Sequence, residues 1–176
     1  MRFTEAPLRG VFVIDLDFLT DERGHFARTF DVAEFSAQGL DAAVVQCNTS
    51  YNARRGTLRG MHYQAAPNGE AKLVRCTRGS IFDVAVDLRA ESETYCRWFG
   101  VELSADNGRM LYIPVGLAHG FQTLEDGSEV SYQMSHQYVP DHARGVRFDD
   151  PAFGIDWPLS DPIVSDRDRQ HPDFQG

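Results

Sequence analysis

Basic and titratable side chains are concentrated in "RGTLRGMHYQ", residues 55–64, a segment that otherwise has the composition of a β-strand. His62 suits proton transfer, because a neutral imidazole accepts protons near pH 7. Arg59 carries a planar guanidinium, which binds phosphate or carboxylate groups through two parallel hydrogen bonds. The segment therefore predicts a general base and an anion-binding group on the same strand.

Arg59 and His62 are three positions apart, which bears on whether they can share a cavity. On a regular strand such residues face opposite sides of the sheet. Gly60 lies between them and permits a β-bulge, which would turn both side chains to one face. We therefore expect a bulge at Gly60 and a cavity that both side chains reach.

Short segments with alternating or β-branched apolar residues recur along the chain, each bounded by Gly, Asp, Asn or Pro. Many short strands with turn residues between them predict an all-β sandwich or barrel. The expected strands lie in "GVFVIDLDF", "GHFARTF", "AAVVQCNTS", "GTLRGMHYQ", "AKLVRCTRG", "SIFDVAVDLR", "RWFGVELSA", "GRMLYIPVG", "GFQTLED" and "EVSYQMSHQY".

One helix is expected, at "DVAEFSAQG". Asp31 is placed to cap its first turn, Glu34 completes a capping-box pattern, and Gly39 can end it. The tail from Asp149 is rich in Pro and Asp and is expected to form loops and short turns around the barrel.

The 176 residues suit a single domain, 1–176, with one core. A formal net charge of −9 disfavours binding to nucleic acid or to anionic membranes. No apolar run has the length of a signal-peptide core or a membrane span. The three cysteines are widely spaced and predict buried, reduced thiols rather than a disulfide framework. A cytoplasmic protein is expected.

Two stretches share a spacing of glycine and histidine. Gly56 precedes His62, and in "GRMLYIPVGLAHG" Gly108 leads through a proline and a second glycine to His119. The two stretches resemble the paired motifs of the cupin superfamily. The resemblance implies an all-β, cupin-like fold, a double-stranded β-helix or jelly-roll barrel with a few short helices.

Metal-binding cupins supply a His-x-His pair and a glutamate from the first motif. In this sequence the position two after His62 is Gln64, and Glu70 is displaced. Two histidines alone rarely hold a transition metal, which needs three or four ligands. No metal site is therefore expected, and the cavity of the barrel needs another use.

A longer series of motifs indicates that use: "DERGHF", "QCNTS", "GTLRGMHYQ", "KLVRCTRGSIFDVAVDLR", "PVGLAHGF", "SYQMSHQY", "DDPAFGIDWP" and "VSDRD". Their order resembles the dTDP-4-dehydrorhamnose 3,5-epimerase family from about residue 10 to residue 168. That family acts on a nucleotide-linked 4-keto-6-deoxyhexose and inverts ring carbons beside the ketone. The resemblance implies an epimerase that needs no metal or organic cofactor.

Inversion beside a ketone makes specific demands on the protein. A base must remove the weakly acidic proton, and a nearby group must stabilise the enolate oxygen. The proton must then return on the other face of the ring. A base and a separate acid are needed on opposite walls of a narrow cavity, which a barrel provides.

The resemblance assigns these roles to individual residues. His62 is the base, Asp168 orients it and fixes its tautomer, and Tyr132 is the proton donor on the far face. Lys72 alternates with apolar neighbours, so it is expected to point inward and stabilise the enolate. A purely structural role stays open for each of these residues. His62 would then be a core histidine, Asp168 a solvated carboxylate, Tyr132 a tyrosine that packs in the barrel, and Lys72 a surface lysine.

The substrate-binding residues implied by the resemblance are Arg23, Phe26, Gln46, Asn48, Arg59, His119 and Tyr138. Arg59 matches a pyrophosphate ligand, Gln46 and Asn48 match nucleotide and sugar contacts, and Tyr138 matches an aromatic beside the sugar. His119 matches a contact to the C4 oxygen or a support for His62, and a histidine that fixes the hairpin is an open alternative.

Arg23 and Phe26 match residues that reach into a neighbouring subunit's site. The resemblance therefore implies a homodimer that exchanges N-terminal strands.

Three departures from the family pattern leave part of the function open. The segment 46–59 is one residue longer, Arg28 stands where many members have glutamate, and "DHARGVRF" lacks a glutamate before its glycine. By the resemblance, these positions lie near the nucleobase and the sugar of the substrate. The identity of the nucleotide, the identity of the sugar, and the inversion of C3, C5 or both therefore stay open. The alternatives are a mono-epimerase on another nucleotide-linked 4-keto sugar, a non-catalytic cupin that binds a sugar nucleotide, and a metal-dependent cupin.

Overall fold

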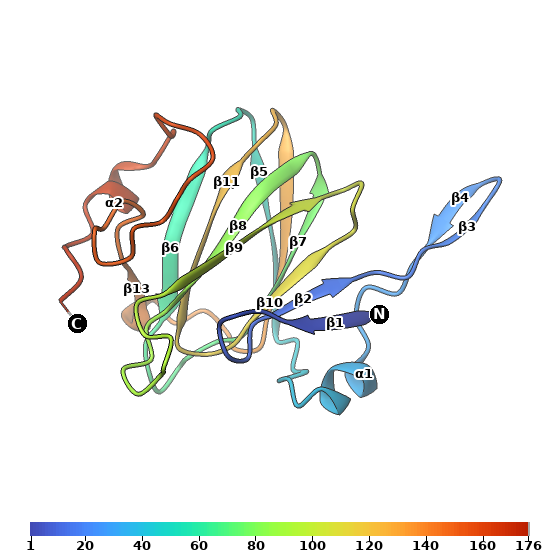
Figure 1. Cartoon of the computed structure of the whole chain (residues 1–176), viewed down its shortest axis with the longest axis horizontal. Helices are drawn as coiled ribbons and strands as arrows, with labels where there is room; N and C mark the ends of the chain where they lie inside the picture. The colour runs from blue at the N-terminus through green and yellow to red at the C-terminus, as the bar shows by residue number, and fades with distance from the viewer. Residues whose placement is uncertain (176) are drawn as a thin grey trace.

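The computed structural model describes residues 1–175 as two facing antiparallel sheets, with a separate hairpin projecting from one end (Figure 1). The six-stranded sheet contains, in spatial order, β1 (Arg2–Glu5), β2 (Phe12–Asp15), β10 (Met110–Ile113), β7 (Lys72–Arg78), β12 (Ser128–Met134) and β5 (Gln46–Asn52). The five-stranded sheet contains β13 (Ala143–Gly145), β6 (Leu58–Gln64), β11 (Leu117–Thr123), β8 (Ser80–Asp87) and β9 (Trp98–Ser104). The hairpin contains β3 (Leu19–Asp21) and β4 (Gly24–Phe26).

Alternating side chains explain why the two sheets pack together. Val74 and Val130 from the six-stranded sheet meet Ile81, Ala85 and Phe121 from the five-stranded sheet in one core, and all five are buried. Apolar residues on alternate positions of a strand face one side, so each sheet buries one face. The prediction of an all-β protein with few and short helices is confirmed.

Each expected strand segment overlaps an observed strand, but some limits differ. "GHFARTF" is extended only to Phe26, and "AAVVQCNTS" forms a strand only from Gln46. β11 begins at Leu117, before the segment expected for it, and so includes His119. The short strands β1, β3 and β13 were not predicted, because three or four residues give too little periodicity for a strand pattern.

Helix α1 (Val32–Ala37) forms where it was expected. Asp31 caps it by accepting from the N–H groups of Ala33 and Glu34, at 2.9 and 3.3 Å. The capping-box role expected for Glu34 is wrong, because its carboxylate accepts from the N-terminal ammonium at 3.1 Å instead. Gly39 follows the helix with a φ of +71°, a conformation that glycine adopts without strain.

The tail after Asp149 is more ordered than predicted. It contains the single-turn helix α2 (Asp166–Arg169), and a 3₁₀ turn (Pro140–His142) precedes it in the chain. The tail packs along β6, where Leu58 N–H donates to Ile163 O at 2.9 Å (Figure 1). These contacts place α2 beside β6.

None of the helices among residues 1–175 combines the length and hydropathy needed to span a bilayer.

Candidate active site

A cavity of about 330 Å³ opens between the two sheets. Its size falls in the range of small-molecule sites. It is lined by Asn48, Ser50, Arg59, His62, Tyr63, Gln64, Glu70, Lys72, His119, Phe121, Tyr132, Met134, Tyr138, Ala143, Arg144 and Arg167. Seven of the eleven predicted site residues are thus brought to one cavity from distant parts of the sequence: Asn48, Arg59, His62, Lys72, His119, Tyr132 and Tyr138.

The bulge predicted at Gly60 is present. His62 pairs with His119, whereas Arg59 pairs with Phe121, so three steps on β6 match two on β11. Gly60 has a φ of +131°, and a Cβ built there would lie 2.5 Å from Cα of Gly120. Only glycine fits this close approach of two backbones. The bulge turns both Arg59 and His62 toward the cavity, as expected.

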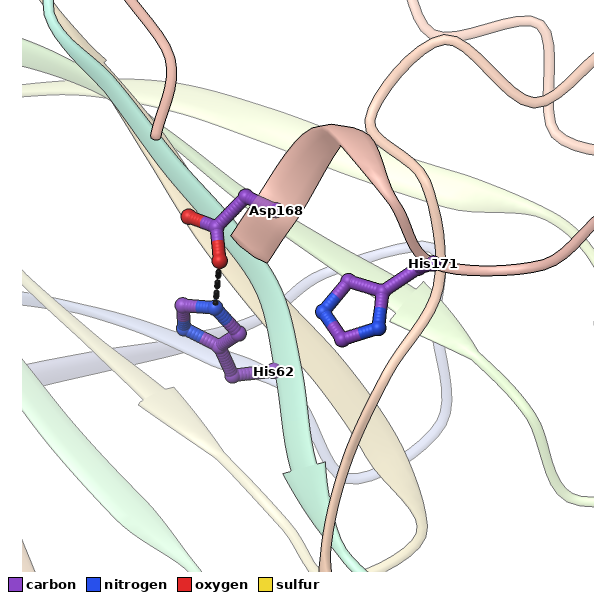
Figure 2. Close-up of side chains that lie close together, drawn as sticks. All are labelled: His62, Asp168 and His171. Atoms are coloured by element: carbon purple, nitrogen blue, oxygen red, sulfur yellow. Dashed lines mark hydrogen bonds and ion pairs between the residues drawn. The ribbon is translucent and has the colours of Figure 1, made fainter. Parts of the chain in front are cut away.

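His62 and Asp168 form a hydrogen-bonded pair, with Nε2 of His62 2.8 Å from Oδ1 of Asp168 (Figure 2). The second oxygen of Asp168 accepts from the Gly60 N–H at 3.2 Å. Burial favours the neutral acid, but the hydrogen bonds and the charge of His62 outweigh it and lower the pKa of Asp168. An ionised Asp168 accepts the Nε2 proton of His62, so Nδ1 keeps its lone pair.

Exposure differs within this pair in a way that suits a base and its support. The side chain of His62 is 41% exposed, whereas that of Asp168 is 6% exposed. The other ring nitrogen of His62 is turned away from Asp168 (Figure 2). The imidazole therefore reaches the cavity, while its partner, which belongs to α2, is shielded from solvent.

Tyr132 and Lys72 approach the cavity from the other sheet, on β12 and β7. Burial, with the nearby Asp83 carboxylate as a second cause, raises the pKa of Tyr132 above its ordinary value. The phenol therefore keeps its proton across physiological pH. Lys72 Nζ lies 3.2 Å from Glu70 Oε1 and donates to the His62 carbonyl at 3.2 Å. Burial lowers the pKa of Lys72, and the charge of Glu70 opposes this shift.

His119 is held by a carboxylate that sequence reasoning did not identify. Its Nε2 lies 2.7 Å from Oδ1 of Asp83, and both side chains are buried. Burial raises the pKa of Asp83, against the influence of His119 and Lys72. The ring of His119 packs edge-to-face on Tyr132, with ring centroids 6.0 Å apart. A second histidine–carboxylate pair thus lies beside the first, and the two histidines are cross-strand partners on β6 and β11.

Metal-binding cupins use a His-x-His pair and a glutamate, and the corresponding side chains here are engaged differently. The amide nitrogen of Gln64 donates to Glu70 at 3.0 Å, and its oxygen accepts from Val139 N–H at 2.6 Å. Glu70 is ion-paired with the ammonium group of Lys72. A fixed positive charge beside the glutamate repels a cation, so these residues do not fit a resident metal in the cavity.

The predicted binding residues differ in how closely they approach the cavity. Asn48, Arg59 and Tyr138 line it. Gln46 lies at the rim, where its side chain accepts from Tyr138 N–H at 2.9 Å and donates to Asn48 at 3.4 Å. Arg59 is oriented by donation from its Nε to Asn52 at 2.7 Å.

Arg23 and Phe26 lie on the projecting hairpin β3–β4, away from the cavity of their own chain (Figure 1). Phe26 is 67% exposed, and so is its cross-strand partner Leu19, at 68%. Arg23 is ion-paired with Asp21 of the same hairpin. These two residues contribute to a site only if the hairpin meets another molecule.

Sequence reasoning missed several groups around the site: Glu70, Asp83, Arg144, Arg167 and His171. Asp83 offered a signal, since a carboxylate inside the apolar strand "SIFDVAVD" must be buried and paired. Arg144 and Arg167 gave none, because exposed arginines are common and only the fold brings them to the mouth of the cavity.

Comparisons with known proteins agree with this architecture. A model of the dTDP-4-dehydrorhamnose 3,5-epimerase family matches residues 5–176. A relative of that name from Methanothermobacter thermautotrophicus is 48% identical over 172 residues, which cover 96% of this chain and 91% of the relative.

Solved structures extend the comparison. The dTDP-6-deoxy-D-glucose-3,5-epimerase from Legionella pneumophila, crystallised with dTDP-4-keto-L-rhamnose, superposes with a TM-score of 0.91 at 32% identity, covering 99% of both chains. A 3'-monoepimerase from Streptomyces bikiniensis, in complex with dTDP-quinovose, gives a TM-score of 0.89 at 35% identity over 96% of this chain and 85% of that one. The chain therefore belongs to the dTDP-4-dehydrorhamnose 3,5-epimerase family and is an isomerase with a cupin-like, all-β fold.

Proposed function

We propose that this protein inverts C3 and C5 of a dTDP-linked 4-keto-6-deoxyhexose, in the biosynthesis of a rhamnose-like deoxysugar. Membership of the family supports this substrate class. The observation that carries the proposal is that His62 and Tyr132 line one cavity from two opposing sheets. An inversion needs a base and an acid on opposite faces of the sugar ring, and this arrangement supplies both.

In this proposal His62 is the base. Asp168 holds the Nε2 proton, so Nδ1 accepts the proton from the carbon beside the ketone. The carboxylate also stabilises the imidazolium that forms. Asp168 is therefore a positioning residue that acts through His62.

Lys72 and His119 are proposed to stabilise the enolate. As the proton leaves, negative charge develops on the C4 oxygen. The ammonium group of Lys72, held in place inside the cavity, stabilises this charge strongly. Lys72 is already oriented by Glu70 and by the His62 carbonyl, so little reorganisation is needed. His119, held by Asp83, is the second donor toward the same oxygen.

Tyr132 is proposed to return the proton on the far face. Its raised pKa keeps the phenol protonated until the enolate forms. The enolate carbon then takes that proton, and solvent restores it to the phenol. The edge-to-face contact with His119 fixes the ring plane during this step.

The nucleotide pyrophosphate is proposed to bind at the mouth of the cavity. Arg59, Arg144 and Arg167 all line it, although the protein as a whole carries a formal net charge of −9. Local positive charge of this kind attracts an anionic substrate to one place on an acidic surface. Asn48, Gln46 and Tyr138 are proposed to contact the nucleotide and sugar beside it.

Incubation with dTDP-4-keto-6-deoxyglucose in heavy water tests the proposed function. NMR is expected to show deuterium entering at both C3 and C5, with formation of the doubly inverted sugar. Exchange at one carbon only would indicate a mono-epimerase, and binding without exchange would indicate a non-catalytic protein.

Exhaustive chelation is expected to leave the rate of epimerisation unchanged, because the Gln64–Glu70–Lys72 cluster does not fit a metal. Loss of activity that one divalent ion restores would contradict this.

We also propose a homodimer in which the hairpin β3–β4 of each subunit completes the partner's site. An isolated two-stranded hairpin is marginally stable in water. This one presents Leu19 and Phe26 to solvent, which a partner's surface would cover. Arg23 would then add a positive charge beside the partner's bound substrate.

Complementation between two inactive variants tests this exchange. His62→Asn and Arg23→Ala are each expected to form dimers of low activity. Co-refolded in equal amounts, they form hybrid dimers in which one site combines an intact His62 with an intact Arg23, which gives about a quarter of wild-type activity. Activity no higher than the sum of the separate variants, or an active monomer by light scattering, would contradict strand exchange.

The chain is proposed to act as a single domain, 1–176, in the cytoplasm, with neither nucleic acid nor membrane as a partner. All three cysteines are free thiols, which suits a reducing compartment, but the expectation that all are buried is wrong, because Cys47 is exposed and Cys96 is only partly buried.

A further inference from the structure

His171 lies beside the His62–Asp168 pair and has no part in the reaction proposed above. It follows α2 in the chain, and its ring is turned toward the pair (Figure 2). The rings of His62 and His171 have centroids 6.3 Å apart and are tilted by 73°. One potential ligand atom from each of the three residues lies within 4.8 Å of the other two.

The nitrogen Nε2 of His171 is buried and has no hydrogen-bond partner among residues 1–175. A buried polar atom without a partner is costly and calls for an explanation. Its ring packs on Gly145, where a built Cβ would lie 2.2 Å from this same nitrogen. Glycine at position 145 therefore makes room for the imidazole next to His62. Burial, followed by the influence of His62, lowers the pKa of His171, so its lone pair is free at neutral pH.

We propose that His62, Asp168 and His171 form a binding site for a late first-row divalent cation such as Zn²⁺, and that this cation reversibly inhibits the enzyme. Two imidazole nitrogens and one carboxylate oxygen are a donor set that Zn²⁺ accepts, with a fourth position left for water. This site lies on the α2 side of His62 and is separate from the Gln64–Glu70–Lys72 cluster inside the cavity. The functional consequence rests on the proposed role of His62, but the binding does not.

The geometry requires an adjustment of both parts of the site: the His62–Asp168 pair opens, and His171, whose ligand atom lies within 4.8 Å of theirs, moves closer. Zinc ligands at about 2.1 Å in a tetrahedron lie about 3.4 Å from one another. Nε2 of His62 and Oδ1 of Asp168 are 2.8 Å apart, so the pair opens slightly when a cation replaces the shared proton. A second cavity, lined by Tyr63, Arg144, Gly145 and His171, gives the ion a path from solvent.

Inhibition follows from the tautomers of imidazole. In the free protein the ring proton of His62 is on Nε2, facing Asp168, and Nδ1 is the base. A cation on Nε2 displaces this proton to Nδ1, since a neutral imidazole carries one N–H. No proton is lost overall, but Nδ1 can no longer accept the substrate proton. The charge of Arg167, next in the chain to Asp168, opposes cation binding and lowers the affinity of the site.

Calorimetric titration of the tag-free protein with Zn²⁺, in the absence of substrate, tests the site directly. Wild type is expected to bind one Zn²⁺ per chain, and His171→Asn to bind it about tenfold or more weakly, since loss of a ligand costs at least as much as loss of an outer-sphere partner. His136→Asn removes a partly exposed histidine that is not one of the three proposed ligands, and it is expected to bind like wild type. Long-range ¹H–¹⁵N spectra are expected to show the His62 ring proton moving from Nε2 to Nδ1.

Activity supplies a second readout. Zn²⁺ is expected to inhibit wild type and His136→Asn, with recovery on chelation, and to inhibit His171→Asn only at about tenfold higher concentration or above. Mg²⁺, which prefers oxygen ligands, is expected to have no effect. His171→Gln is a second variant if His171→Asn fails to fold. Equal Zn²⁺ affinity in wild type and His171→Asn, no binding at all, or equal inhibition by Mg²⁺ would each overturn the proposal.

Discussion

His62→Asn is expected to lose both epimerisation and solvent deuterium exchange, by about a hundred- to ten-thousandfold. Among residues 1–175, no other side chain of the five-stranded sheet that lines the cavity combines a free lone pair with the exposure of His62. His119 lies next to it but is buried and bonded to Asp83. Removal of the base therefore stops the first step, and no exchange precedes it.

Binding should survive this substitution. The arginines at the mouth of the cavity are untouched, so the affinity for dTDP is expected to stay within about threefold of wild type. The measurement is NMR of the 4-keto sugar nucleotide in heavy water, with calorimetry for dTDP. His136→Asn is the matched control and should exchange normally. Exchange by His62→Asn at the wild-type rate would show that another group is the base.

Asp168→Asn separates orientation from basicity. The imidazole stays in the cavity, but the carboxylate that holds its Nε2 proton is replaced by a neutral amide. The rate of exchange is therefore expected to lie between those of wild type and His62→Asn. A rate as low as that of His62→Asn would mean that the ring needs Asp168 to stay in place at all.

Tyr132→Phe is expected to separate exchange from inversion. The ring keeps its packing on Phe121 and His119, with centroids 6.4 and 6.0 Å away, so the fold is preserved. His62 can still remove the proton, exchange it with solvent and return it on the same face. Inversion needs the opposite-face donor and is expected to fall about a hundredfold or more, while exchange continues.

Product and isotope content are measured on one sample by NMR for this variant. The signature is substrate that contains deuterium but keeps its original configuration. Tyr51→Phe, on the neighbouring strand β5 and 57% exposed, is the control and should invert normally. Unchanged inversion in Tyr132→Phe would assign the proton donor elsewhere. Equal loss of exchange and inversion would mean that the phenol is needed already when the proton leaves.

The sequence by itself determined the class of fold. Alternating apolar residues in ten short segments bury one face of each strand. This alternation has a period of two residues, so it can be recognised from neighbouring positions in the sequence alone. The bulge at Gly60 was predictable for the same reason, since the requirement for a residue without a side chain is local. The strands β1, β3 and β13 were not predictable, because three or four residues show too little periodicity, and β13 in addition pairs with β6, which is distant in sequence.

The candidate site was predictable only where motif order carried it. His62, Lys72, His119 and Tyr132 stand in recognisable strands, and resemblance to a family supplied their roles. Their partners Glu70 and Asp83 were missed, because nothing in the chain states which buried carboxylate meets which cation. The pairing of Asp83 with His119 is decided by the register of β8 against β11.

The resemblance named Asp168 as the partner of His62, but only the tertiary structure shows how that partner reaches the base and what else lies beside it. Asp168 is 106 residues from His62, and a helical turn that propensity did not indicate brings it within 2.8 Å. The same turn brings in His171, which has its place only because residue 145, on another strand, is a glycine. Contacts between segments so far apart depend on the packing of the tail along β6, and packing depends on the shape of the whole molecule rather than on any local pattern.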